Sequence, residues 1–212
     1  MPPKTKEELR KEREAIRKRK QANLAKLKPL KKEVEGLDEK IAHQSKLIAE
    51  KTKKIRAQNK PLNAKALAVA ETMIGVMEQG GNNTGPEVDK IIRANGGVIG
   101  EPWCGDFVAF CYRQAGSKKV DRSWASVNAI EGGNYGDFVR TNNPAAGDVV
   151  TYSFSHTGIF KRWIDRAKGL FETIEGNTGS IGAVSDSLTG GDGVYDKNRN
   201  TNLGVSFWKV TG

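Results

Sequence analysis

The first 60 residues carry a heptad repeat, which restricts this part of the chain to an elongated helix. Apolar residues recur at alternating spacings of three and four and fall into two columns. One column holds Leu27, Val34, Ile41, Ile48, Ile55 and Leu62; the other holds Leu9, Ile16, Leu30 and Leu37, with Asn23 and Gln44 in the same register. This period is typical of a coiled coil. We therefore predict two domains, a helical arm over residues 1–60 and a globular domain over residues 61–212.

Charge is divided unevenly between these two parts. Residues 1–60 contain 20 of the 35 Lys and Arg residues but only 9 of the 25 Asp and Glu residues, so the arm carries +11 and the remainder −1. One interpretation is a solvated helical spacer or a self-association element. The other is an anchor for polyanions such as anionic wall polymers or a lipid surface. The arm has no aromatic residue to stack on a base, so we expect no sequence-specific nucleic-acid binding.

Pro29 interrupts the arm, because proline removes a helical hydrogen bond and clashes with the preceding turn. We expect helices near 4–27 and 31–58, arranged as a bent rod or as a hairpin. A linker is predicted at residues 57–61. His43 lies on a polar face and is expected to be a solvated residue without a site role.

The N-terminus has positive charges but no apolar stretch behind them, so we expect no secretory signal. We therefore expect either that the protein works in the cytoplasm or that something other than the general secretory route releases it. Two cysteines are too few for a disulfide framework. If both lie in one helix, the Cα atoms of Cys104 and Cys111 would be about 10 Å apart. Disulfide-bonded Cα atoms lie within about 7 Å, so we expect no disulfide between these two residues.

The pattern after residue 61 predicts an α+β domain, with helices first and an antiparallel sheet after them. Helical spacing covers residues 64–78, 86–95 and 104–115. After Gly147 and Asp148 the period changes to two. Strands are predicted at 149–154, 156–160, 170–175 and 204–210.

Three short motifs supply the groups that a cysteine hydrolase needs. Cys104 is predicted at the first turn of a helix, where the free amides and the positive dipole end favour a thiolate. His156 is the only histidine outside the arm and is the candidate base. Glu175 and Asn177 are two apart in a predicted strand, so their side chains would share a face and either would orient the imidazole.

Three segments in this order resemble the CHAP family, the cysteine, histidine-dependent amidohydrolases/peptidases of bacterial walls and phage lysins. They are Glu78-Gln79-Gly80-Gly81-Asn82-Asn83 ahead of Pro102-Trp103-Cys104, Pro144-Ala145-Ala146-Gly147-Asp148-Val149-Val150 ahead of His156-Thr157-Gly158, and Ile174-Glu175-Gly176-Asn177-Thr178. The resemblance covers roughly residues 65–210. It implies a papain-like fold and cleavage of a peptidoglycan amide bond, as an N-acetylmuramoyl-L-alanine amidase or as a peptide endopeptidase.

The resemblance also implies roles for single residues. Cys104 would be the nucleophile, His156 the base, Glu175 the orienting acid and Asn177 a polar fourth member. Trp103 is expected to line the substrate groove. Some relatives bind calcium through an acidic loop, but this sequence has only Glu87 and Asp89 there, and Asp192 and Asp196 lack EF-hand spacing. We therefore expect neither a metal nor a cofactor.

Three functions remain open on this evidence. The first is a phage endolysin, a bacteriolytic and hence antimicrobial enzyme that causes host lysis. The second is a virion-associated or autolytic wall hydrolase within a larger assembly. The third is a non-catalytic protein whose coil binds polyanions or builds a structure; the intact cysteine, histidine and glutamate set argues against it.

Overall fold

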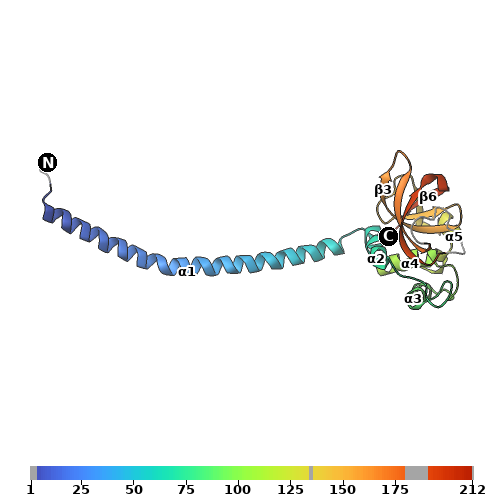
Figure 1. The fold of residues 1–212 in the computed structure, drawn as a ribbon, viewed down its shortest axis with the longest axis horizontal. Coiled ribbons are helices and arrows are strands. Elements are labelled where there is room, and N and C mark those ends of the chain that lie inside the picture. The colour runs from blue at the N-terminus through green and yellow to red at the C-terminus, as the bar shows by residue number, and fades with distance from the viewer. Residues whose placement is uncertain (1–3, 134–135, 180–190, 212) are drawn as a thin grey trace. The chain divides into compact units, whose positions relative to one another are not determined.

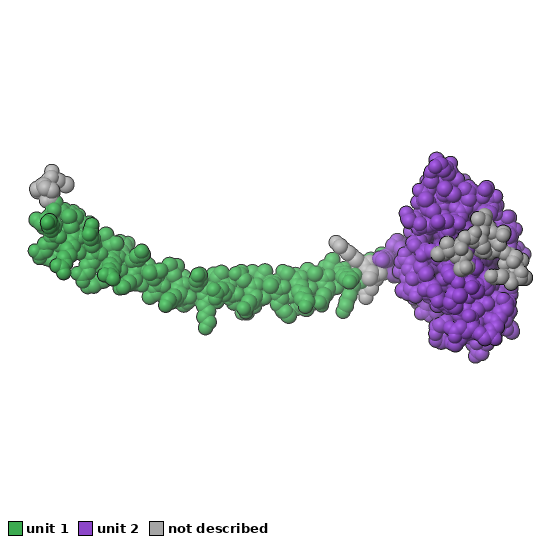
Figure 2. All heavy atoms as spheres, viewed as in Figure 1, with its two compact units in different colours: residues 1–59 green, residues 60–212 purple. Residues whose placement is uncertain are grey.

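The computed structural model describes residues 4–133, 136–179 and 191–211. The chain divides into two compact units, residues 1–59 and residues 60–212 (Figure 2). Each unit is described by itself below. Within the described ranges, no helix combines the length and the apolar composition that a membrane span requires.

The first unit is one helix, α1 (Lys6–Gln58), which curves gently along its length (Figure 1). Thr5 caps its start: the Thr5 hydroxyl accepts from the Glu8 amide at 3.3 Å, and the Glu8 carboxylate accepts from the Thr5 amide at 2.8 Å. The predicted break at Pro29 is wrong, and so is the hairpin, because Pro29 lies inside a continuous helix. Proline deprives a single carbonyl of its donor, and the turns on either side, rich in Leu, Lys, Ala and Glu, continue the helix past it.

The second unit begins with the helices α2 (Leu62–Met73), α3 (Pro86–Ala94) and α4 (Cys104–Gln114). A 3-10 helix, η1 (Arg122–Ala125), and a short helix, α5 (Val127–Glu131), follow. The helix predicted over 64–78 ends early. Gly75 takes a φ of +90° and its amide donates to the Val194 carbonyl at 3.0 Å, so the chain leaves the helix to join the edge of the sheet.

Six antiparallel strands form one sheet in the order β1-β6-β2-β3-β4-β5. The strands are β1 (Phe138–Thr141), β2 (Val149–Tyr152), β3 (His156–Asp165), β4 (Leu170–Thr178), β5 (Gly193–Asn200) and β6 (Val205–Val210), with a 3-10 turn, η3 (Thr201–Leu203), before the last. The α+β prediction is confirmed, with the helices and the antiparallel sheet in the expected order. The structure adds β1 and β5. Asp196 lies within β5, and Asp192 directly precedes this strand.

Two apolar clusters fill the second unit. The larger one lies between the helices and the sheet and includes Trp103, Phe107, Tyr112, Trp124, Ile159 and Ile174. The smaller one is built by Val150, Tyr152, Phe160, Phe171 and Phe207. Of the helices, α4 makes the most extensive contact with the central strands β3 and β4. This packing brings the first turn of α4 against the strands that carry His156 and Glu175.

Candidate active site

Cys104 is the first residue of α4 and is almost fully buried, with 6% of its surface exposed. The first-turn amides of a helix have no partner within it, and its dipole is positive there, so a negative charge that develops near this position is stabilised. Gly105 fixes the turn against η1. A Cβ at Gly105 would lie 2.6 Å from the Cα of Ala125, so only glycine allows the two backbones to approach this closely.

His156 is the first residue of β3, and the chain enters this strand through Ser155, whose φ is +61°. The imidazole is buried and stacks beside the rings of Tyr152 and Phe154, at centroid distances of 5.8 and 5.9 Å. Its Nε2 lies 3.0 Å from Oε2 of Glu175. Cys104 is near enough to raise the pKa of His156, and because Nε2 faces the carboxylate, Nδ1 is the nitrogen that remains for the thiol. The imidazole therefore lies between a sulfur and a carboxylate.

The electrostatics of the site favour a charged imidazole. Burial alone would lower the pKa of His156, but the charge and hydrogen bond of Cys104, together with those of Glu175, raise this pKa to about 10. An imidazolium at neutral pH in turn stabilises a neighbouring thiolate. The geometry thus supports an ion pair of the kind that cysteine hydrolases use to attack a carbonyl carbon.

The Glu175 carboxylate is fully buried, and four donors keep it ionised besides His156. Its Oε1 accepts from Tyr152 Oη at 2.7 Å, from Thr173 Oγ1 at 2.6 Å and from Arg199 Nε at 3.0 Å, and its Oε2 accepts from Arg199 Nη2 at 2.5 Å. Burial would raise the pKa of Glu175, but the hydrogen bonds and charges of Arg199 and His156 hold it well below the ordinary 4.5. The carboxylate is a fixed negative charge behind the imidazole.

The structure places the other two predicted site residues differently. Asn177 has a φ of +53° and lies at a register shift in β4, so the strict alternation that would put it on the same face as Glu175 is interrupted. Among the described residues, no hydrogen bond joins its side chain to His156. Trp103 is fully buried in the larger apolar cluster, where its Nε1 donates to Glu78 Oε1 at 2.9 Å. Its ring packs on Gly176 rather than facing a groove.

Sequence reasoning missed the residues that surround the carboxylate: Tyr152, Thr173 and Arg199. Arg199 lies in β5, which has no apolar alternation because Lys197 and Arg199 are its inward-facing residues. A search for strands by apolar alternation alone assigns this segment to a loop, because its alternating residues are the basic Lys197 and Arg199. Their spacing of two was the available evidence for a strand.

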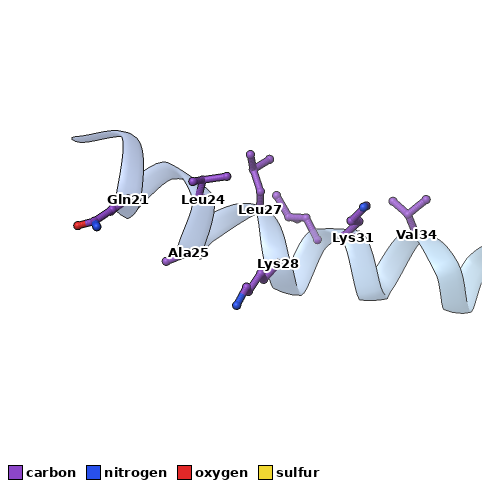
Figure 3. A pocket seen from close by; sticks show the side chains of 8 residues that line it. Gln21, Leu24, Ala25, Leu27, Lys28, Lys31 and Val34 are labelled. Carbon is purple, nitrogen blue, oxygen red and sulfur yellow. The ribbon is translucent and has the colours of Figure 1, made fainter. Parts of the chain in front are cut away.

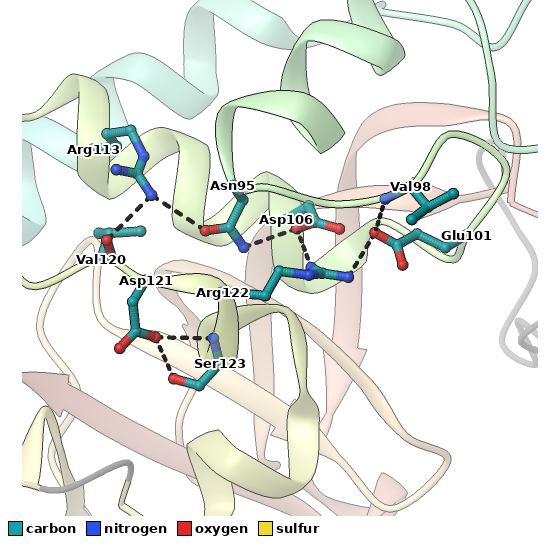
Figure 4. A network of polar contacts seen from close by, with 9 residues as sticks. All are labelled: Asn95, Val98, Glu101, Asp106, Arg113, Val120, Asp121, Arg122 and Ser123. Atoms are coloured by element: carbon teal, nitrogen blue, oxygen red, sulfur yellow. Dashed lines mark hydrogen bonds and ion pairs between the residues drawn. The ribbon is translucent and has the colours of Figure 1, made fainter.

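A polar network holds the first turn of α4 from the other side (Figure 4). Asn95 Nδ2 and Arg122 Nη1 each donate to Asp106 Oδ1 at 2.8 Å, and Arg122 Nη2 donates to Glu101 Oε1 at 2.6 Å. Asp106 is fully buried, and burial raises the pKa of this carboxyl. The network links α4 to the end of α3 and to η1. It thereby fixes the helix start on which Cys104 lies.

The second cysteine and the acidic residues form no further site. Cys111 is fully buried, and burial raises the pKa of its thiol far above the ordinary value. Throughout the part of the chain that the structure describes, no cluster of three or more His, Cys, Asp or Glu side chains is placed to hold a metal ion. Asp89, in the first turn of α3, accepts from Thr84 Oγ1 and from the Gly85 amide.

Comparison with known proteins finds a family model but no individual relative. Residues 96–177 match the family model described as the CHAP domain. This range contains Cys104, His156 and Glu175, and it ends at Asn177. No curated protein and no solved structure matches the chain.

Proposed function

Since the chain carries a CHAP domain, which supports a hydrolase acting on peptidoglycan, we propose that it cleaves an amide bond of the wall by a thiol mechanism. The observation that carries the proposal is the position of His156 between two buried groups. Cys104 is near enough to raise the pKa of His156, and Nε2 of His156 lies 3.0 Å from Oε2 of Glu175. The base therefore has the nucleophile and the orienting acid as neighbours.

In the proposed reaction, the Cys104 thiolate attacks the amide carbonyl carbon and forms a C–S bond. The oxygen gains negative charge, and the first-turn amides of α4 are placed to stabilise it. The His156 imidazolium then gives its proton to the amide nitrogen, the C–N bond breaks and the amine leaves. Neutral His156 next removes a proton from a water molecule, which hydrolyses the thioester to a carboxylic acid and restores the thiolate. Glu175 keeps the imidazole in one orientation throughout.

The test is digestion of purified peptidoglycan by wild type, Cys104→Ala and Cys111→Ala, with product masses read by mass spectrometry. We expect wild type and Cys111→Ala to release fragments and Cys104→Ala to lose several orders of magnitude in rate, by analogy with triads that act as a unit. Cys111 is the matched control because it is the other free thiol, on the same helix. Full activity of Cys104→Ala would overturn the thiol mechanism.

The same digest decides which bond is cut. We propose either an N-acetylmuramoyl-L-alanine amidase or a peptide endopeptidase, since both reactions use this set of groups. An amidase releases the stem peptide from the lactyl group of the glycan. An endopeptidase leaves the stem attached and creates a new amino terminus within the stem or the cross-bridge.

We also propose that the protein is a phage endolysin, held in the host cytoplasm until the membrane is permeabilised, with the basic arm as its contact to anionic wall polymers. The arm supports this because residues 1–60 carry a net charge of +11. The protein expressed inside bacteria should cause lysis only after a pore-forming agent is added. Lysis without such an agent would favour the autolytic role. Loss of binding to walls stripped of their anionic polymers would support the role of the arm.

A further inference from the structure

A stripe of large apolar side chains runs along α1 and is exposed to solvent. Its members are Leu9, Ile16, Leu24, Leu27, Leu30, Val34, Leu37, Ile41, Leu47, Ile48 and Ile55, and their exposed fractions lie between 39% and 62%. Near its middle, Leu24, Leu27 and Val34 point to one side of the helix, whereas Ala25 and Lys28 point to the other (Figure 3). This surface is open to solvent and includes Leu24, Leu27, Leu30 and Val34, so its apolar side chains are available to a partner.

We propose that a second copy of this chain covers the stripe and that the two α1 helices form a parallel, in-register coiled coil. The spacing of the stripe carries the first step. Its main positions repeat every seven residues in two columns, which is the narrow seam of a coiled coil and not the broad apolar face of a helix that lies on a membrane. This inference does not depend on the proposed hydrolase activity.

The residue types at the two columns select the number of strands. The column that begins at Leu27 continues with the β-branched residues Val34, Ile41, Ile48 and Ile55. The other column supplies leucine, at Leu30 and Leu37. β-branched residues at the first heptad position with leucine at the fourth favour two parallel helices.

Pro29 fits the same arrangement. Two positions after Leu27, it occupies the third position of the heptad, on the outer side of the seam. The carbonyl that loses its donor belongs to Ala25. The side chain of Ala25 points away from those of Leu27 and Val34 (Figure 3). The proline therefore leaves the contact surface of the helix intact.

Between residues 20 and 55 the polar residues at seam positions are Lys20, Asn23, Gln44 and Lys51. Each lysine faces a lysine in either orientation, so the two amides decide between them. In a parallel pair Asn23 faces its own copy and Gln44 faces its own copy, so each amide has a hydrogen-bonding partner. Consider the antiparallel pair in which Val34 of one helix faces Leu37 of the other. Asn23 would then face Ile48 and Gln44 would face Leu27, and each amide would be left without a hydrogen-bonding partner.

The charged residues that flank the seam favour the antiparallel orientation, but they contribute less free energy than the amides within the seam. An antiparallel pair would bring Glu33 to Lys40 and Lys31 to Asp38 of the second copy, whereas a parallel pair brings Glu33 to Asp38. Exposed ion pairs contribute little and are screened by salt. An unsatisfied amide within a seam costs more than such a pair gains. The parallel pair is therefore the more stable of the two arrangements.

The test is sedimentation equilibrium of the full chain, of Ile41→Glu and of the neighbouring control Ala42→Glu. Ile41 lies in the seam and Ala42 outside it, and both changes introduce the same residue. We expect wild type and Ala42→Glu to have twice the chain mass of 23.2 kDa. Ile41→Glu should dissociate with a dissociation constant raised on the order of 100-fold, since two carboxylates then share one buried layer. Circular dichroism verifies that the second unit stays folded in each variant.

Cross-linking in a Cys104→Ser background tests the orientation. Ile48→Cys should form a disulfide-linked dimer with itself, because residue 48 faces residue 48 in the parallel pair. A mixture of Ile48→Cys and Asn23→Cys chains should form no mixed dimer; a mixed dimer would overturn the orientation in favour of antiparallel pairing. A wild-type chain that stays monomeric at its highest soluble concentration would overturn the proposal altogether. Binding of that monomer to anionic lipid vesicles would then identify a lipid surface as the occupant.

Discussion

Arg199 holds both oxygens of the Glu175 carboxylate, through Nε to Oε1 at 3.0 Å and through Nη2 to Oε2 at 2.5 Å. The second of these oxygens is also the one that faces His156. Arg199 therefore sets the orientation of the carboxylate, and the carboxylate sets the orientation of the base. Both side chains are almost completely buried, so water does not screen their interaction.

Replacing Arg199 by Met should lower the free energy of unfolding by about 3–5 kcal/mol, since it leaves a buried carboxylate without its main partner. Chemical denaturation measures this change. Arg162→Met is the matched control: Arg162 also holds a carboxylate, Glu172, with two hydrogen bonds, but it is largely exposed. Its loss should cost at most about 1 kcal/mol. Equal effects of the two substitutions would contradict the structural role of Arg199.

The activity should persist to alkaline pH, because the pKa of His156 is raised from 6.5 to about 10. A raised pKa means that the imidazolium stabilises the fold fully below pH 6.5, and that this contribution is lost as the pH rises towards 10. The alkaline limb of kcat/KM should therefore lie well above pH 6.5. In Glu175→Gln it should move to lower pH, because the charge that favours the imidazolium is gone; Glu172→Gln is the control. An unmoved limb in Glu175→Gln would show that the carboxylate does not act on His156.

Acid should destabilise the second unit through Glu175. Its pKa lies below 4.5 in the folded state, so its contribution to stability is present above pH 4.5 and is lost as the pH falls below that value. Denaturation curves of wild type and Glu175→Gln between neutral and acidic pH measure this effect. The stabilities of the two proteins should converge on acidification. Parallel curves would mean that the carboxylate is not ionised in the native protein.

Alkylation should distinguish the two thiols at neutral pH. Cys104 lies beside the His156 imidazolium and should react with iodoacetamide faster than a free thiol does. Cys111 is fully buried and should react only after unfolding. Peptide mapping by mass spectrometry locates the label. His156→Ala should slow the labelling of Cys104; labelling at an unchanged rate would remove the basis for the ion pair.

Gly105→Ala should lower both stability and activity although alanine is the better helix former. The added Cβ would lie 2.6 Å from the Cα of Ala125, and backbone cannot yield as a flexible side chain can. Overpacking of this kind costs about 1–3 kcal/mol. Gly36→Ala is the contrast, because a Cβ there meets nothing within 4 Å and should stabilise α1 by up to about 1 kcal/mol. Thermal melts and the wall digest measure the two effects, and a fully active Gly105→Ala would show that η1 does not fix the first turn of α4.

Much of the framework was predictable because it depends on local signals. The start of α4 at Cys104, the start of α3 at Pro86 and the strand after Asp148 follow from spacing and from turn residues. The candidate role of Glu175 required its strand to pair beside the strand of His156, and the sequence left that pairing open. The structure has this pairing, with Ile159 opposite Ile174.

The remaining features depend on contacts between distant parts of the chain. The helix α2 ends before Gly75 because the Gly75 amide donates to the Val194 carbonyl. Val194 is distant in sequence, so no local pattern predicts this hydrogen bond. The prediction that Asn177 shares a face with Glu175 assumed strict alternation, and a register shift against β5 between Glu175 and Thr178 interrupts that alternation. Trp103 looked like a groove residue because it is aromatic and precedes the cysteine, but Glu78 accepts its indole hydrogen within the core. A break was predicted at Pro29 because only the free-energy cost of a proline within a helix was considered. Once the flanking turns are formed, the helix extends past the proline.

The position of β5 at the edge of the sheet has a consequence for any minimal active fragment. The segment that matches the family, residues 96–177, keeps the thiol, the imidazole and the carboxylate. It lacks Arg199, and it also lacks β6, which lies between β1 and β2 in the sheet. A fragment cut at the family boundary would hold a buried anion with no guanidinium to balance it and a sheet missing an inner strand. The three candidate catalytic groups thus lie within the matched segment, but the ionic partner of Glu175 and an inner strand of the sheet come from the last twenty residues of the chain.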